Sequence, residues 1–264
     1  FYDNKRFDQQ RSYYLSDVLD YVTSNDPSKM DYITTREKKE NYFPVKNFLV
    51  DVDKEAVKAT GFIPDRDTAK IVDQISWNIG VNGLSKGDLT VLDIIATNAK
   101  QGWKRPIYWT TTTGSSVYLK LDKYLRHNGL TYQLLPIERK PRLRGMDDMD
   151  MLYDKLMNVY EWGNMEKGEL FLDDKAQLVP QNLRSLFVQV ADYKSRNNEL
   201  DSAMKMMDYC YEVMPESILP MNLRLKAASA DIYYRGGATE KGDQFLTEVG
   251  DAALELVKYY ADFS

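Results

Sequence analysis

The amino-acid sequence predicts a mixed α+β protein in which a small α/β layer is followed by a tetratricopeptide-like α-helical region. Up to residue 137, apolar residues at helical spacing alternate with strand-type runs, which is typical of an α/β layer. Residues 138–145 are charged, broken by proline and poor in apolar side chains. Beyond them almost every apolar pattern is helical. We therefore expect an α/β portion over residues 1–140 and a helical portion over residues 146–264.

The first elements are short and well punctuated. Ser16 is expected to cap a helix that runs to Val22. Residues 42–52 alternate with period two and predict a strand, which Pro44 places at a sheet edge. A short helical segment at 55–60 follows. The apolar run 71–79 fits a strand or a helix equally well, because short apolar runs do not discriminate between them.

A firmer pattern of helix and strand follows residue 84. Residues 85–88 lead into a helix with apolar positions on one face, and Gly102 ends it. Residues 107–112 predict a strand, 117–127 a second helix and 130–137 a second strand. These alternating elements complete the expected α/β layer.

The helical portion carries a repeat signal. Ala191, Ala203 and Pro215 fall twelve residues apart, which matches the small, small and proline positions of a tetratricopeptide unit. Ala230 and Gly242 repeat the interval more loosely. Small residues suit these positions because the two helices of such a pair cross closely. Arrays of this kind present a groove to peptides, so part of this surface is expected to bind a partner.

Composition excludes some classes of function. The formal net charge is −5, so the basic field that binds nucleic acid is missing. The single cysteine, Cys210, can form no intrachain disulfide. No apolar run approaches the roughly 20 residues that span a bilayer. The chain begins at Phe1 rather than at Met, and we expect it to be a piece of a longer protein. We expect no cofactor.

The most specific segment is 88–137. It holds Asp93-Ile-Ile-Ala-Thr-Asn98, then Arg105-Pro-Ile-Tyr-Trp109 and a tyrosine- and leucine-rich run. This segment resembles the soluble C-terminal part of a family of large multi-pass bacterial membrane proteins, whose membrane half resembles protein O-mannosyltransferases. The missing membrane half is where such enzymes keep their catalytic acid.

This resemblance implies a non-catalytic extracytoplasmic domain at the periplasmic face of the inner membrane. Such a domain would bind a protein or glycan partner near the membrane active site of a glycosyltransferase-like parent protein. One alternative is a nucleotide-sugar or glycan-binding enzyme domain that uses Asp51 and Asp53. Another is a stand-alone soluble scaffold protein.

Two acidic clusters are candidate cation sites. Asp51 and Asp53 follow a predicted strand and could hold a divalent ion on a nucleotide-sugar phosphate, but we interpret them in the first place as ordinary turn residues at a strand exit. The cluster 147–150 lacks the glycine and distal glutamate of an EF-hand loop. It precedes a predicted helix, so we interpret it as a helix cap.

Aromatic and cationic residues supply the binding candidates. Trp103, Lys104 and Arg105 could bind a sugar or an anionic head group by stacking and charge, or could simply lead into the next strand. Tyr193 and Tyr209 are candidates for the helical groove.

The remaining chemistry-bearing residues are interpreted as structural. His127, the one histidine, is expected near a helix C-terminus and has no partner base or nucleophile by motif. The cationic run 139–144 is interpreted as an interdomain linker rather than a membrane-surface segment.

Overall fold

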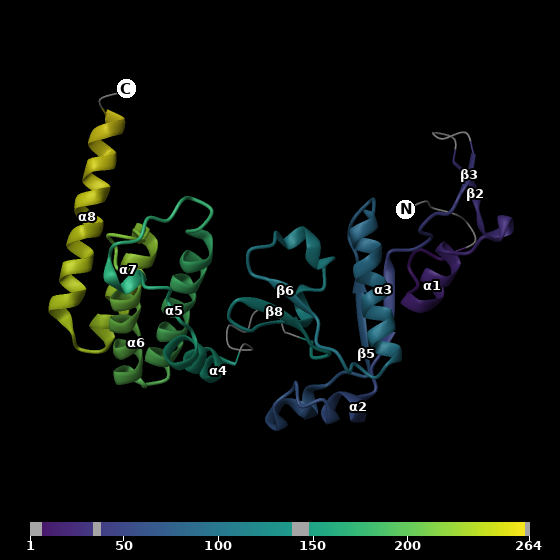
Figure 1. Cartoon of the computed structure of the whole chain (residues 1–264), viewed down its shortest axis with the longest axis horizontal. Helices are drawn as coiled ribbons and strands as arrows, with labels where there is room; N and C mark the ends of the chain where they lie inside the picture. The colour runs from purple at the N-terminus through teal and green to yellow at the C-terminus, as the bar shows by residue number, and fades with distance from the viewer. Residues whose placement is uncertain (1–6, 34–37, 139–147, 262–264) are drawn as a thin grey trace. The chain divides into compact units, whose positions relative to one another are not determined.

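A computed structural model describes residues 7–33, 38–138 and 148–261 of the chain. The chain divides into two compact units (Figure 1), each described by itself below. Unit 1 lies within residues 1–126 and 131–146, and unit 2 lies within residues 127–130 and 147–264. The predicted mixed α+β class with a helical C-terminal region is confirmed. Within the described ranges, no helix has the length and apolar character needed to cross a membrane.

The main sheet of unit 1 has three strands. They are β1 (Tyr13–Tyr14), β4 (Asn47–Asp51) and β5 (Gln74–Asn78), in the order β1-β4-β5. Strand β4 runs parallel to β1 and antiparallel to β5. Helices α1 (Leu15–Val22) and α3 (Lys86–Lys100) both contact β4.

Alternation along the strands decides which face of this sheet is buried. Phe48 pairs with Trp77 and Val50 pairs with Ile75, and all four side chains are buried. They join the core that α3 supplies through Leu92, Ile95 and Ala96. The opposite face carries polar residues, as expected for an antiparallel pair with one solvated side.

The smaller elements of unit 1 complete the layer. Strands β2 (Asp31–Ile33) and β3 (Lys38–Glu40) pair in antiparallel orientation, and α2 (Lys54–Ala59) follows β4. A third sheet has the order β6-β8-β7. Its strands are β6 (Tyr108–Thr110), β7 (Leu125–His127) and β8 (Thr131–Leu134).

Two local predictions in unit 1 were wrong. Helix α1 begins one residue before Ser16, and its N-cap is Tyr14, which makes no side-chain cap bond. The strand predicted over 42–52 is shorter and is central rather than an edge strand. Pro44 lies ahead of β4, so it removes no hydrogen bond from the ladder.

The predicted helix over 117–127 is also wrong. This stretch forms two 3₁₀ turns, Ser115–Tyr118 and Asp122–Tyr124, and then β7. Leu119 and Lys120 adopt positive φ, which an α-helix does not tolerate. The Tyr124 hydroxyl accepts a hydrogen bond from the Ser76 amide at 3.0 Å, so β5 is tied to this segment.

Unit 2 is helical. Helix α4 (Met149–Asp154) continues as a π-helical turn to Val159. The later helices are α5 (Leu178–Arg196), α6 (Leu200–Val213), α7 (Leu223–Arg235) and α8 (Thr239–Ala261). Helix α5 packs against α6, and α7 packs against α8.

Small residues lie where the repeat pattern predicted close helix contact. Ala191, Ala203 and Ala230 are buried. A Cβ atom on Gly242 would lie 2.8 Å from the Tyr234 ring, closer than carbon atoms normally approach. At Gly242, therefore, the predicted small residue marks a close contact between α7 and α8.

The core of unit 2 encloses a cation and a thiol. Arg184 is buried, and its guanidinium donates hydrogen bonds to the backbone carbonyls of Met214 and Leu219. Cys210 is buried as well, and burial raises the pKa of its thiol to about 12. The thiol is therefore protonated and unreactive at neutral pH.

Candidate functional site

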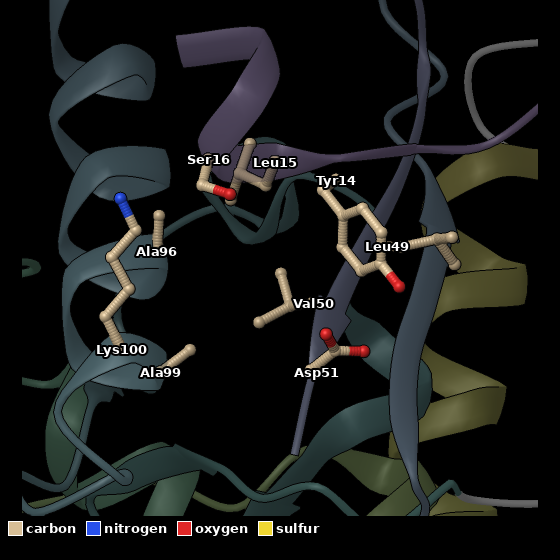
Figure 2. A pocket seen from close by; sticks show the side chains of 9 residues that line it. All are labelled: Tyr14, Leu15, Ser16, Leu49, Val50, Asp51, Ala96, Ala99 and Lys100. Carbon is tan, nitrogen blue, oxygen red and sulfur yellow. The ribbon is translucent and has the colours of Figure 1, made fainter. Parts of the chain in front are cut away.

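Unit 1 contains a hollow of about 250 Å³ beside β4 (Figure 2). Three segments from distant parts of the sequence surround it: the start of α1, the end of β4 and the end of α3. The lining residues are Tyr14, Leu15, Ser16, Leu49, Val50, Asp51, Ala96, Ala99 and Lys100. The hollow is smaller than the roughly 300–1,000 Å³ of drug-sized ligand sites, so it suits one small group.

The hollow exists because β1 is shorter than β4. Strand β1 ends at Tyr14, opposite Leu49, and the chain then turns into α1. In an antiparallel ladder, hydrogen-bonded and non-hydrogen-bonded residue pairs alternate. The Val52 amide donates to the Asp73 carbonyl at 2.9 Å, so the neighbouring pair, Asp51 with Gln74, is a non-hydrogen-bonded pair. The backbone N–H and C=O of Asp51 therefore point away from β5, toward the edge that β1 leaves uncovered.

Polar side chains stand on opposite sides of the hollow. The Asp51 carboxylate accepts a hydrogen bond from Gln74 Nε2 at 2.7 Å, and the same amide nitrogen donates to the Tyr14 hydroxyl at 3.3 Å. Lys100 lies across the hollow in the last turn of α3, where the helix dipole favours a cation. Among the described residues, its ammonium group makes no hydrogen bond or ion pair.

The floor of the hollow is apolar. Leu15, Val50 and Ala96 are buried beneath it. Ser16 adds a hydroxyl at the start of α1 (Figure 2). The site therefore combines hydrogen-bond donors and acceptors at its rim with an apolar surface below, an arrangement that suits a small polar ligand.

The two carboxylates of the predicted cation site have different surroundings. Asp53 is the N-cap of α2, and its side chain accepts a hydrogen bond from the Ala56 amide at 2.9 Å. Asp51 lines the hollow. In the part of the chain that the structure describes, no three or more His, Cys, Asp or Glu residues are grouped as metal ligands. The metal hypothesis stays a prediction, and the observed geometry gives Asp53 a capping role.

The structure places the Trp103 group in a loop after α3. Trp103 is buried with φ of 58°, whereas Lys104 and Arg105 are exposed. The side chain of Asn98 donates to the Arg105 carbonyl at 2.7 Å and accepts from the Arg105 amide at 3.1 Å. A buried ring cannot stack on a ligand, so only the two cations remain as binding candidates here.

The two candidate tyrosines of unit 2 differ in exposure. Tyr193 on α5 is 36% exposed. Tyr209 on α6 is half-buried; its hydroxyl accepts a hydrogen bond from Trp162 Nε1 at 3.1 Å, and its ring contacts those of Trp162 and Phe187. Tyr193 is thus available to a partner, while Tyr209 is engaged in packing. Their role in binding stays a prediction.

The other candidate residues are structural or lie outside the described ranges. His127 is half-buried at the end of β7, so its expected place at a helix C-terminus was wrong. Asp148 caps α4 by accepting from the Met151 amide at 3.1 Å. Asp147 and the cationic run 139–144 lie outside the described residues.

Comparison with known protein families finds a matching family model. Residues 1–153, more than half of the chain, match the family model described as TMEM260-associated domain 2. The chain belongs to this family. TMEM260 is a protein O-mannosyltransferase, and the matched model describes a domain associated with it. No curated protein and no solved structure matches the chain.

The matched range of the TMEM260-associated domain includes every residue that lines the hollow. Among them, the sequence alone singled out only Asp51 as a candidate site residue. Ser16 was predicted only as a helix cap, and Ala96 belongs to the motif that carries the resemblance. The lining as a whole could not be predicted, because it comes from three separate segments that meet only in the fold. The one available signal was the strand-end carboxylate itself.

Proposed function

We propose that this chain is a non-catalytic extracytoplasmic domain of a bacterial, multi-pass, mannosyltransferase-like membrane protein. In this role it holds a protein or glycan partner near the membrane active site. The observation that carries the proposal is the match to TMEM260-associated domain 2 over residues 1–153. The polar hollow in unit 1 and the exposed Tyr193 on α5 support a binding role.

The membrane context is tested first in native cells. An antibody raised against this chain is applied to fractionated cells and to intact spheroplasts treated with protease. We expect a polypeptide much larger than 30.6 kDa in the membrane pellet, cleaved by protease added from outside. A soluble band near 30.6 kDa would contradict the proposal and favour a stand-alone scaffold.

Partner binding is tested at Tyr193. A photo-crosslinking amino acid at this position in the native protein should capture one reproducible partner in intact cells. Position 205 on α6, where Lys205 is exposed, serves as the control site. Equal capture of many proteins from both positions would argue against a partner at the α5 surface.

A further inference from the structure

We infer that the hollow between β4, α1 and α3 is a binding site for a single neutral sugar ring. This inference rests on the proposed function and deepens it, because it names the class of ligand and the residues that would hold it. The argument starts from the two polar sides of the hollow, continues with its floor and ends with the strand edge.

Opposed donors and acceptors match the hydroxyl groups of a sugar. A hydroxyl both donates and accepts hydrogen bonds. The carboxylate of Asp51 accepts on one side, while the ammonium of Lys100 donates on the other (Figure 2). The Ser16 hydroxyl donates to Asp17 Oδ1 at 3.4 Å, so toward the hollow it offers an acceptor. Hydrogen bonds to charged groups are roughly twice as strong as those between neutral groups. Neighbouring sugar hydroxyls can therefore use both charges without carrying a charge themselves.

Gln74 orients the Asp51 carboxylate as a hydrogen-bond acceptor. Its side-chain amide holds Asp51 Oδ1 at 2.7 Å and also donates to the Tyr14 hydroxyl at 3.3 Å. Asp51 is thereby oriented, and its second carboxylate oxygen has no hydrogen bond to any described residue. Because Asp51 and Lys100 are exposed, water screens them, and a charged ligand gains little from them individually.

The floor suits the carbon face of a ring. Leu15, Val50 and Ala96 present buried apolar side chains beneath the polar rim. Tyr14 stands at the rim with 42% of its surface exposed. Aromatic and aliphatic groups of this kind cover the C–H face of a sugar while its hydroxyls bond at the edge.

The strand edge favours a compact ligand over an extended peptide. The backbone groups of Asp51 point toward the edge beyond β1, as argued above. A peptide strand added there would have to continue β1, but α1 begins directly after Tyr14 and occupies that path. The volume of about 250 Å³ also leaves no room for several residues. A single ring can occupy the hollow without adding a strand to the sheet.

The test is a titration of the whole isotope-labelled chain with methyl mannoside and methyl glucoside, followed by NMR. We expect saturable shifts of the Tyr14, Val50 and Lys100 amide signals with at least one of the two sugars. The variant Asp51→Asn should weaken binding about tenfold, because it loses a charge-assisted hydrogen bond. Ala99→Leu should weaken it at least as much by filling the hollow.

Matched variants separate local effects from general ones. Asp65→Asn removes the same charge as Asp51→Asn from an exposed position outside the hollow, and should leave binding unchanged. Thermal unfolding confirms that each variant is folded.

Three results would overturn the sugar site. They are the absence of saturable shifts with either sugar, unchanged binding in the folded Ala99→Leu protein, and equal shifts produced by inorganic phosphate or glycine. The membrane fractionation and the crosslinking at Tyr193 do not depend on the hollow. If they succeed while both sugars fail, the sugar site is lost and the proposed function stands.

Discussion

At the scale of single residues, the segment that carries the family resemblance has a structural role: it closes the loop after α3. Asn98 ends the buried face of α3, and its side-chain amide holds both backbone groups of Arg105. Gly102 and Trp103 between them take positive φ, which brings the loop back onto the helix. The sequence run Asp93–Asn98 followed by Arg105–Trp109 thus encodes a closed loop rather than a reactive centre.

Replacing Asn98 by alanine tests this closure. The change leaves two backbone groups of Arg105 without partners in a half-buried loop, and each lost hydrogen bond costs about 1 kcal/mol or more. We expect Asn98→Ala to lower the free energy of unfolding of unit 1 by about 2 kcal/mol, measured by urea denaturation. Thr97→Ala, on the exposed face of the same helix, should change it little. Equal effects of the two variants would contradict the closure.

At the scale of elements, local signals predicted α3 well. The structure closes the start of this helix with a reciprocal capping box between Ser85 and Asp88, two residues of the segment that predicted its start. The predicted helix over 117–127 was wrong for two reasons. The Ser76 amide, distant in sequence, donates a hydrogen bond to the Tyr124 hydroxyl, and the positive φ of Leu119 is incompatible with an α-helix. The hollow could not be predicted, since its walls are brought together by strand pairing and helix packing.

Two substitutions of Asp53 distinguish a helix-capping role from a cation-binding role. Asparagine caps a helix as well as aspartate does, whereas alanine does not. Asp53→Ala should therefore destabilise unit 1 by about 1 kcal/mol, while Asp53→Asn should leave its stability unchanged. Calorimetric titration with manganese on both variants then tests the cation hypothesis. Metal binding by the native chain that disappears in the stable Asp53→Asn protein would support that hypothesis.

An ion pair between α7 and α8 predicts a pH dependence. Lys226 Nζ lies 2.6 Å from Glu248 Oε2, and this hydrogen bond lowers the pKa of Glu248 below its ordinary value of 4.5. A lowered folded-state pKa contributes stability above the unfolded value, and this contribution is lost as the pH falls through the folded value. Glu248→Gln should therefore cost unit 2 a few tenths of a kcal/mol at pH 7, and less as the pH falls below the unfolded value.

The control for this ion pair is Glu255→Gln on the same helix. It removes the same charge from an exposed residue that has no ion pair within the described part of the chain. Chemical denaturation at several pH values measures both variants. A Glu248→Gln penalty that stays constant from pH 7 to pH 3 would refute the assignment to this pair.

At the scale of the whole molecule, two cores predict two unfolding transitions. The apolar clusters of unit 1 and unit 2 are separate sets of residues. Arg184→Met removes the donors to two carbonyls and should destabilise unit 2 by about 2–4 kcal/mol. Calorimetry should show that this variant moves one transition and that Asn98→Ala moves the other. A single transition shifted by both variants would show that the units unfold together.

The buried thiol of Cys210 is a built-in probe of how often the helices of unit 2 open. It is the one cysteine of the chain, and its sulfur is shielded in the packed helices of unit 2. An alkylating reagent can reach the sulfur only when these helices open, so the rate of alkylation reports the frequency of opening. Since unit 1 contains no thiol, the alkylation rate reports on unit 2 alone. Opening of these helices can thus be measured in the native sequence, without an introduced cysteine.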